Sequence, residues 1–433
     1  MNGLNRDILR LALPSIVSNI TVPLLGLCDV AIMGHVGGAT SIGAISVGSM
    51  IFNVMYWLFA FLRMGSSGLA AQAYGAQRRG DAAAILWRGL MLGVVIGVVI
   101  VVLQWPLQQL TFWLMRPTAD VAQLCLPYYY IGIWGAPAVL GQFALTGWLV
   151  GMQNTRVPML IAIGQNVVNI GLSLLLVVGF HWGVKGVATG TLVAQWLAFA
   201  ACLLLLWRRY GPLLRANWPS RSQLMKGLGP FFRLNLDIFL RTVCLVSVNL
   251  WFTSAGAAQG ALTLAANTLL MQFFMIYSYL TDGFAFAGEA LSGRYMGAGN
   301  GTMLRLTVRR LFGWGLAVAL VFTVAYAVGG PLLLQLLTTD AQVIAEALRY
   351  LPWAVAIPLA GMAAFVWDGI YIGTTKSRGM LLSCFWAALV FFALWLLLSD
   401  SMGNHALWLA LVSYLAMRGW VQTVLWRKEE VYE

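Results

Sequence analysis

The chain alternates between long apolar runs and short breaks that contain glycine, proline or charged residues. Each run holds about 20 or more mostly uncharged residues, which is the length that an α-helix needs to cross the hydrocarbon core of a bilayer. We therefore predict an all-α polytopic membrane protein. Its twelve transmembrane helices are expected near residues 9–34, 42–72, 85–113, 124–150, 158–180, 184–207, 231–253, 261–292, 306–337, 346–372, 379–399 and 405–426.

The basic residues support an even number of spans. With the N-terminus in the cytoplasm and the loops assigned alternately, almost all of the 26 Lys and Arg residues fall on the cytoplasmic side, Arg418 among them. The exceptions are Arg116, Lys185 and Arg349 in outer loops, and Arg63 and Arg241 within helices. Cytoplasmic loops of membrane proteins carry an excess of Lys and Arg, so we predict that both termini are cytoplasmic.

Composition agrees with this class of protein. Hydrophobic residues make up 61% of the chain and charged residues only 9%, against about 25% charged in a soluble domain. The net charge of +12 follows from the cytoplasmic loops, so we expect no nucleic-acid partner. The histidines and cysteines show no metal-ligand spacing, and no catalytic histidine–acid cluster is present. We therefore expect no metal, no cofactor and no enzymatic activity.

The longest connection between predicted helices covers residues 208–230. It carries several Arg and Lys residues and no acid, so we expect it to lie against anionic lipid headgroups. It also divides the chain into an N-terminal lobe of six helices at 1–207 and a C-terminal lobe of six at 231–433.

The two lobes share an internal repeat. The segment Gly147-Trp-Leu-Val-Gly151-Met-Gln-Asn-Thr-Arg156 matches Gly369-Ile-Tyr-Ile-Gly373-Thr-Thr-Lys-Ser-Arg378, with both glycines and the arginine at equal separations. Because each lobe has six helices, the two repeats have the same orientation in the membrane. This predicts two lobes related by a parallel pseudo-two-fold axis along the membrane normal, which is a transporter architecture.

The first predicted helix contains two residues that are costly inside a membrane. Pro14 removes a backbone donor and bends the helix, and Asp29 places a carboxyl group in a segment otherwise free of charge after Arg10. An intramembrane acid is a functional candidate by default, so we interpret Asp29 as a proton carrier. The alternative is an acid at the outer end of the helix.

Polar residues elsewhere in the N-terminal lobe are candidates to hydrogen-bond Asp29. The alternative role for each is a contact between helices. These residues are Asn19, Asn166, Asn169, Ser173, Thr191 and Gln195.

Four acids lie in the predicted helices of the C-terminal lobe: Asp237, Asp282, Glu289 and Asp368. Asp237 and Arg241 stand at i and i+4, which predicts an ion pair. Asp282 and Glu289 stand at i and i+7 on one helix face. Either the acids form a second cation or substrate site, or they form a network with Arg63 and Arg241. With Asp29 the acids outnumber the arginines in the helices, which suits a cationic substrate.

Several blocks in the right order resemble the multidrug and toxic compound extrusion (MATE) family, in its DinF-like branch. The resemblance covers nearly the whole chain. The blocks are Leu13-Pro14, SNITVPLLGLCDVAIMGH at 18–35, FLRMGSSGLAAQAYGA at 61–76, NLDIFLR at 235–241, DGFAFAGEALSG at 282–293, DGIYIGTTKSR at 368–378 and GNHALWLAL at 403–411.

The resemblance implies a V-shaped antiporter of the bacterial inner membrane that exports cationic or amphipathic compounds in exchange for protons or sodium ions. It implies that the first-helix acid and proline, here Asp29 and Pro14, act together. Relatives often carry N-x3-D in the fifth helix, where this chain has Asn169 and Ser173. That departure leaves Asp29 as the only carboxyl in the helices of the N-terminal lobe.

We therefore expect a monomeric multidrug efflux antiporter that works by alternating access, with H⁺ as the coupling ion. One alternative is coupling to Na⁺ through the C-terminal acids. The other is a lipid-linked oligosaccharide flippase of the same superfamily, whose expected signature is several intramembrane Arg or Lys residues. Only Arg63 and Arg241 are assigned to the membrane interior.

Overall fold

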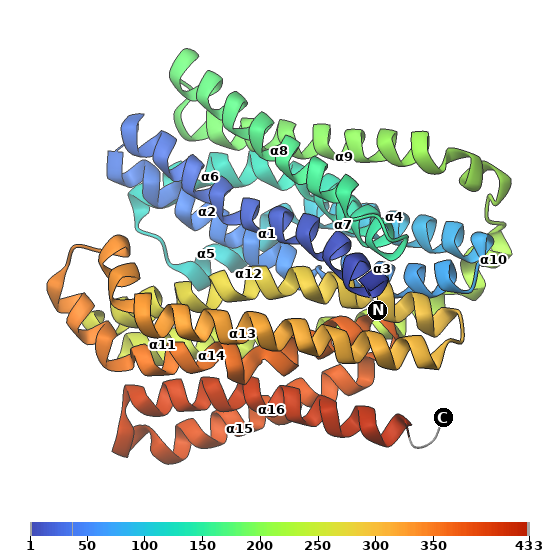
Figure 1. Cartoon of the computed structure of the whole chain (residues 1–433). Helices are drawn as coiled ribbons and strands as arrows, with labels where there is room; N and C mark the ends of the chain where they lie inside the picture. The colour runs from blue at the N-terminus through green and yellow to red at the C-terminus, as the bar shows by residue number, and fades with distance from the viewer. Residues whose placement is uncertain (1, 37, 431–433) are drawn as a thin grey trace. The chain divides into compact units, whose positions relative to one another are not determined.

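The computed structural model describes residues 2–36 and 38–430, and within them all regular structure is helical (Figure 1). The helices are α1 (Asn2–Val36), α2 (Gly38–Leu58), α3 (Phe61–Gly75), α4 (Arg79–Val102), α5 (Gln104–Met115), α6 (Ala119–Gly132), η1 (Ile133–Gly135), α7 (Ala136–Gly151), α8 (Arg156–Leu174), η2 (Leu175–Gly179), α9 (Gly183–Ala216), α10 (Arg221–Lys226), α11 (Leu228–Ala258), α12 (Ala261–Gly297), α13 (Gly301–Leu337), α14 (Ala341–Gly373), α15 (Ser377–Met402) and α16 (Asn404–Glu430).

The predicted membrane spans correspond to these helices. Ten helical segments of the described chain are long and apolar enough to cross a membrane, and α1 and α16 occupy the first and last predicted spans. Some spans consist of consecutive helices, such as Thr40–Gly75 and Ala119–Gly151. The all-α fold with twelve spans is therefore confirmed. The helices extend beyond the apolar runs because polar end residues continue the backbone hydrogen bonding outside the hydrocarbon core.

The chain forms two compact units. One is Val17–Asn235, and the other is Leu236–Glu433 together with Met1–Ile16. In the first unit α7 packs against α3, α4 and α9, and in the second α14 packs against α12, α13 and α16. These units differ from the lobes expected at 1–207 and 231–433, because the first residues of α1 pack with the C-terminal helices.

The connection expected at 208–230 is largely helical and belongs to the first unit. Ser220 caps α10 through a capping box with Gln223. Arg88 of α4 then donates from Nε to the Leu224 carbonyl at 3.0 Å and from Nη2 to the Gln223 carbonyl. A guanidinium that satisfies carbonyls at the end of a short helix fixes this segment on α4.

The internal repeat is visible as equivalent packing in each unit. A Cβ atom added at Gly147 of α7 would collide with the Arg63 backbone of α3, and one at Gly151 would meet the Ser67 carbonyl at 2.5 Å. In the second unit, Gly369 of α14 meets the Ala285 backbone of α12, and Gly373 meets that of Glu289. The glycines of the repeat therefore allow two helix backbones to approach closely in each unit.

Because this approach leaves no room for a methyl group, Gly147→Ala is expected to lower the free energy of unfolding by about 1–3 kcal/mol. Unfolding of the purified protein in detergent measures the change. Gly164→Ala in α8 is the matched control, since a Cβ atom there would meet nothing within 4 Å. Equal stabilities of the two variants would contradict the close-packing role of Gly147.

Candidate functional site

Helix α1 carries both Pro14 and Asp29 and changes packing partners between them. Residues up to Ile16 belong to the second unit, and residues from Val17 belong to the first. The first part packs closely on α12, where a Cβ atom at Gly283 would collide with Ile16 and lie 3.0 Å from the Ala12 carbonyl oxygen. Pro14 cannot donate a backbone hydrogen bond. The helix is therefore weakened just before its packing partners change.

Asp29 lies in the second part of α1 and is only 4% exposed. Its Oδ1 atom has no hydrogen-bond partner among the residues that the structure describes. The Tyr128 side chain of α6 lies within electrostatic range of the carboxyl group, and the Tyr128 hydroxyl is 3.1 Å from Ser49 Oγ of α2. Asp29 is therefore a buried acid without a basic partner in the described part of the chain.

Aromatic rings surround this tyrosine. Phe52 of α2 stacks on Tyr56 and on Tyr129, with ring centroids 5.8 and 5.7 Å apart, and lies 6.1 Å from the Tyr128 ring. The Tyr56 hydroxyl is buried and has no partner among the described residues. The sequence prediction missed this cluster, although three consecutive tyrosines at 128–130 in an apolar run are an unusual polar signal.

Two of the polar residues named as candidate partners of Asp29 make contacts between helices, which was the alternative role. Asn166 of α8 donates to the Thr21 carbonyl of α1 at 2.9 Å, and Asn169 donates to Thr191 Oγ1 of α9 at 2.8 Å. Amides at these positions therefore join neighbouring helices.

The other candidate partners of Asp29 also make contacts of their own. They are Ser173, Gln195 and Asn19. The Ser173 hydroxyl lies 3.5 Å from Asn169 Oδ1, and Gln195 packs against Gly135 of η1. Asn19 has other contacts. Ser173 faces α9, because a Cβ atom at Gly190 of α9 would lie 2.8 Å from Ser173 Oγ.

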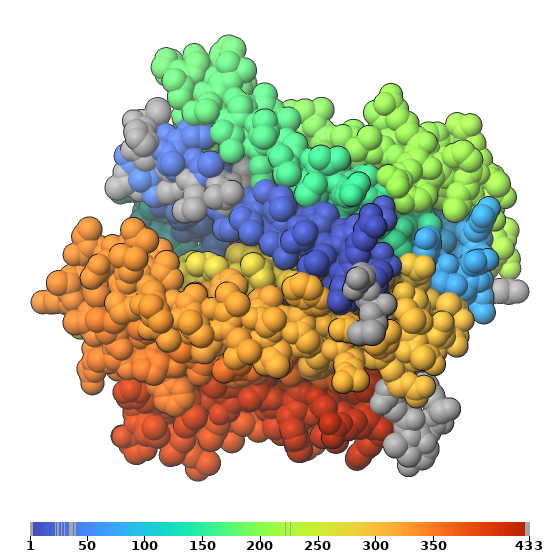
Figure 2. All heavy atoms as spheres, viewed as in Figure 1, coloured from blue at the N-terminus to red at the C-terminus, as the bar shows by residue number. Residues whose placement is uncertain are grey.

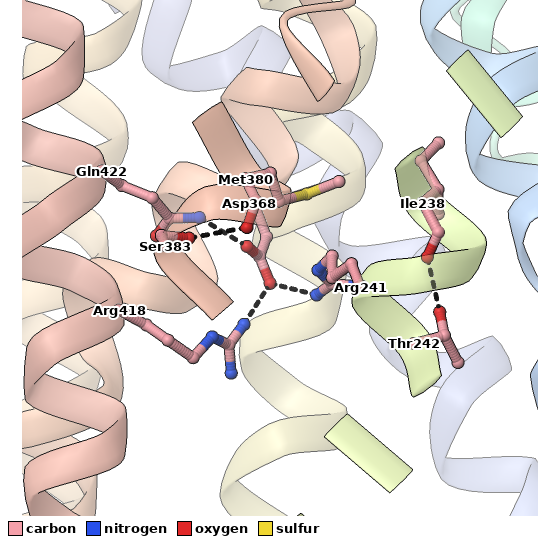
Figure 3. A network of polar contacts seen from close by, with 8 residues as sticks. All are labelled: Ile238, Arg241, Thr242, Asp368, Met380, Ser383, Arg418 and Gln422. Carbon is pink, nitrogen blue, oxygen red and sulfur yellow. Dashed lines mark hydrogen bonds and ion pairs between the residues drawn. The ribbon is translucent and has the colours of Figure 1, made fainter. Parts of the chain in front are cut away.

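A second buried acid, Asp368 of α14, lies in the other unit and is fully engaged (Figure 3). Its Oδ2 atom accepts from Arg418 Nη2 of α16 at 2.6 Å and from Arg241 Nη2 of α11. Its Oδ1 atom accepts from Gln422 Nε2 at 2.8 Å. All four side chains are buried. The network therefore joins α11, α14 and α16.

This network corrects two sequence predictions. Arg241 pairs with Asp368 and not with Asp237, whose Oδ2 atom accepts from Ser377 Oγ at 2.6 Å. Arg418, assigned to the cytoplasmic side, is 4% exposed inside α16. The i, i+4 rule identifies residues on one helix face but not the helix that lies opposite. Arg418 therefore joins Arg63 and Arg241, which were the two arginines assigned to the membrane interior.

The remaining C-terminal acids, Glu289 and Asp282, lie on α12. Glu289 is buried on α12, and Asp282 interacts with Tyr279; both acids, like Arg63, have further contacts. Within residues 2–36 and 38–430 no three His, Cys, Asp or Glu side chains are grouped so that they could hold a metal ion. Asp29 and Asp368 are therefore both buried, but they differ in their basic partners. Asp29 has none in the described part of the chain, whereas Asp368 has two arginines.

Comparisons with known proteins agree along the chain. The family model MatE matches residues 14–175 and 238–397. The DNA damage-inducible protein F of Escherichia coli is 36% identical over 425 residues, which cover 97% of this chain and 91% of that protein. The probable multidrug resistance protein NorM of Thermotoga maritima is 23% identical over 79% of this chain and 74% of its own length.

Solved structures share the fold. A crystal structure of a MATE protein in the bent conformation superposes with a TM-score of 0.87 at 18% identity, covering 98% of this chain and 95% of that chain. An outward-facing multidrug resistance MATE transporter of the MOP superfamily has the same TM-score at 19% identity, with coverages of 98% and 96%. Likeness at this identity concerns the arrangement of helices.

Proposed function

Because this chain belongs to the MatE family of membrane transporters, we propose that it exports lipophilic or cationic compounds in exchange for protons. Asp29 is the proton carrier and Pro14 is the bend in α1. The observation that carries the proposal is the buried Asp29 carboxyl, which has an unpartnered oxygen and no ion pair among the described residues.

The environment of Asp29 suits an exchange of two cations at one carboxyl group. An uncompensated carboxylate is costly to bury, so it attracts either a proton or a cationic substrate. A proton that binds Asp29 removes the negative charge and with it the attraction for the substrate. Because the proton and the substrate compete for the Asp29 carboxyl group, proton uptake is coupled to substrate export.

Helix α1 connects this exchange to a conformational change. Its residues before Val17 pack with the C-terminal helices, and Asp29 lies in the part that packs with the N-terminal helices. Pro14 lacks one backbone hydrogen bond just before this change of partners, so bending there costs less than elsewhere in the helix. Protonation of Asp29 alters its contacts beside Tyr128, and the bend lets the second part of α1 move. Bending of α1 at Pro14 is the conformational change that alternating access requires.

The alternatives fit the described residues less well. Both oxygens of Asp368 already accept hydrogen bonds, so a sodium ion would have to displace Arg241, Arg418 or Gln422. A flippase for a phosphate-linked lipid needs arginines that are available to the phosphate, whereas Arg241 and Arg418 are bound to Asp368. These contacts favour proton coupling through Asp29.

The test is efflux from proteoliposomes that hold a fluorescent lipophilic cation in sodium-free buffer. A pH gradient is expected to accelerate efflux about tenfold or more, and an ionophore that collapses the gradient is expected to abolish the effect. Adding sodium at constant pH is the control and is expected to change nothing. Efflux that requires sodium and ignores the pH gradient would refute the proton proposal and favour the C-terminal acids.

A further inference from the structure

A pocket of about 590 Å³ lies between the first turns of α1 and the N-terminal half of α13. Arg309, Arg310, Gly313 and Trp314 of α13 line it, and Asn5 of α1 closes it. All of these residues belong to the second unit. Figure 2 shows the start of α1, in dark blue, against α13, in gold. The proposed transport mechanism does not use this pocket.

The polar groups of the pocket lack partners in the described part of the chain. Arg309 is exposed and Arg310 is half-buried, and neither forms an ion pair with a described acid. The Oδ1 atom of Asn5 is buried without a hydrogen-bond partner among the described residues. Two guanidinium groups without an acidic partner suit an anionic phosphate.

The internal repeat shows what such an arginine does when a partner is present. The spacing that relates Gly147 to Gly369 relates Arg88 of α4 to Arg310 of α13. Arg88 donates to the carbonyls of Gln223 and Leu224. No described carbonyl satisfies Arg310 in the same way. In the first unit, Arg88 therefore binds oxygen acceptors. In the second unit, the equivalent Arg310 lines an open pocket.

The rest of α13 indicates that the ligand also has an apolar part. Only 17% of its most apolar stretch is buried, and Val321, Val328 and Leu336 are 66%, 81% and 74% exposed. With 37 residues at about 1.5 Å each, α13 is longer than the roughly 30 Å hydrocarbon core. Its arginine end therefore reaches the headgroup region, and the pocket continues into a lipid-facing surface.

We propose that this pocket binds the headgroup of an anionic phospholipid. The phosphate lies between Arg309 and Arg310, and an acyl chain follows the apolar face of α13. Phosphatidylglycerol has both features. The lipid bridges α13 to the first turns of α1, which is the helix that carries Pro14 and Asp29.

Lipid binding to the purified full-length protein tests the proposal without a transport assay. Native mass spectrometry is used to titrate phosphatidylglycerol against phosphatidylcholine with the same acyl chains. R309Q/R310Q is expected to bind phosphatidylglycerol about tenfold or more weakly than wild type, with little change for phosphatidylcholine. R305Q is the matched control, because Arg305 is exposed on the same helix and does not line the pocket.

A second variant distinguishes pocket binding from general charge attraction. A Cβ atom at Gly313 would meet nothing within 4 Å, so Gly313→Leu fills the pocket while it keeps both arginines. It is expected to lose phosphatidylglycerol binding and to keep the wild-type melting temperature. Undiminished binding by Gly313→Leu or by R309Q/R310Q would overturn the proposal. Displacement of the lipid by millimolar inorganic phosphate would also overturn it, in favour of a soluble phosphate ligand.

Discussion

Asp29→Asn is expected to reduce proton-driven efflux by about 100-fold or more, to the rate of protein-free liposomes. Asparagine has nearly the same shape as aspartate but cannot bind and release a proton. Since Asp29 Oδ1 accepts no hydrogen bond from a described residue, the substitution breaks no ion pair and the fold is expected to persist. Efflux driven by a pH gradient, compared between wild type and the variant in the same lipid, measures the effect.

The matched control is Asp120→Asn, which neutralises an exposed acid at the start of α6. It is expected to export at the wild-type rate. The melting temperature of purified Asp29→Asn in detergent, compared with that of wild type, separates loss of coupling from loss of folding. If Asp29→Asn exports normally under a pH gradient, Asp29 is not the proton carrier.

Asp368→Asn is expected to have the largest effect on stability, with a loss of about 3–5 kcal/mol. The carboxylate compensates two guanidinium groups, and both are buried. Its removal leaves Arg241 and Arg418 with unbalanced charge away from water, which costs far more than one lost hydrogen bond. Unfolding of the purified protein in detergent measures the change, and the expression level should fall with it.

The control for this variant is Asp400→Asn, which changes an exposed acid on α15 and is expected to shift stability by less than about 0.5 kcal/mol. Asp368→Asn combined with Arg418→Gln removes one of the two uncompensated charges and should recover part of the loss. Wild-type stability of Asp368→Asn alone would show that Arg241 and Arg418 find other partners. The network around Asp368 would then not be what holds α11, α14 and α16 together.

The sequence was sufficient for the helices, the repeat and the family. Apolar length determines where a chain can cross a membrane, and the paired glycines at 147 and 369 correctly indicated equivalent packing in each unit. The resemblance to the MATE family is confirmed by the match over residues 14–175 and 238–397. These features depend on local composition and on the order of blocks along the chain.

The side-chain partners could not be predicted in this way. Helical spacing placed Arg241 near Asp237 but contained no information about α14, which supplies the actual partner Asp368. Arg418 was assigned to the cytoplasmic side because most arginines belong there. Gln422, one turn later on the same helix, was a signal that this part of α16 has a buried polar face. Such pairings depend on which helices are neighbours in space.

The division of α1 between the two units has a consequence for synthesis of the protein. The ribosome makes Ala12 and Ile16 long before their packing partner Gly283, because the whole of Val17–Asn235 is translated in between. Until α12 has been inserted, the start of α1 lacks the surface on which it finally packs. The C-terminal unit is therefore completed by a segment that is made before the whole of Val17–Asn235, and folding cannot proceed strictly in the order of translation.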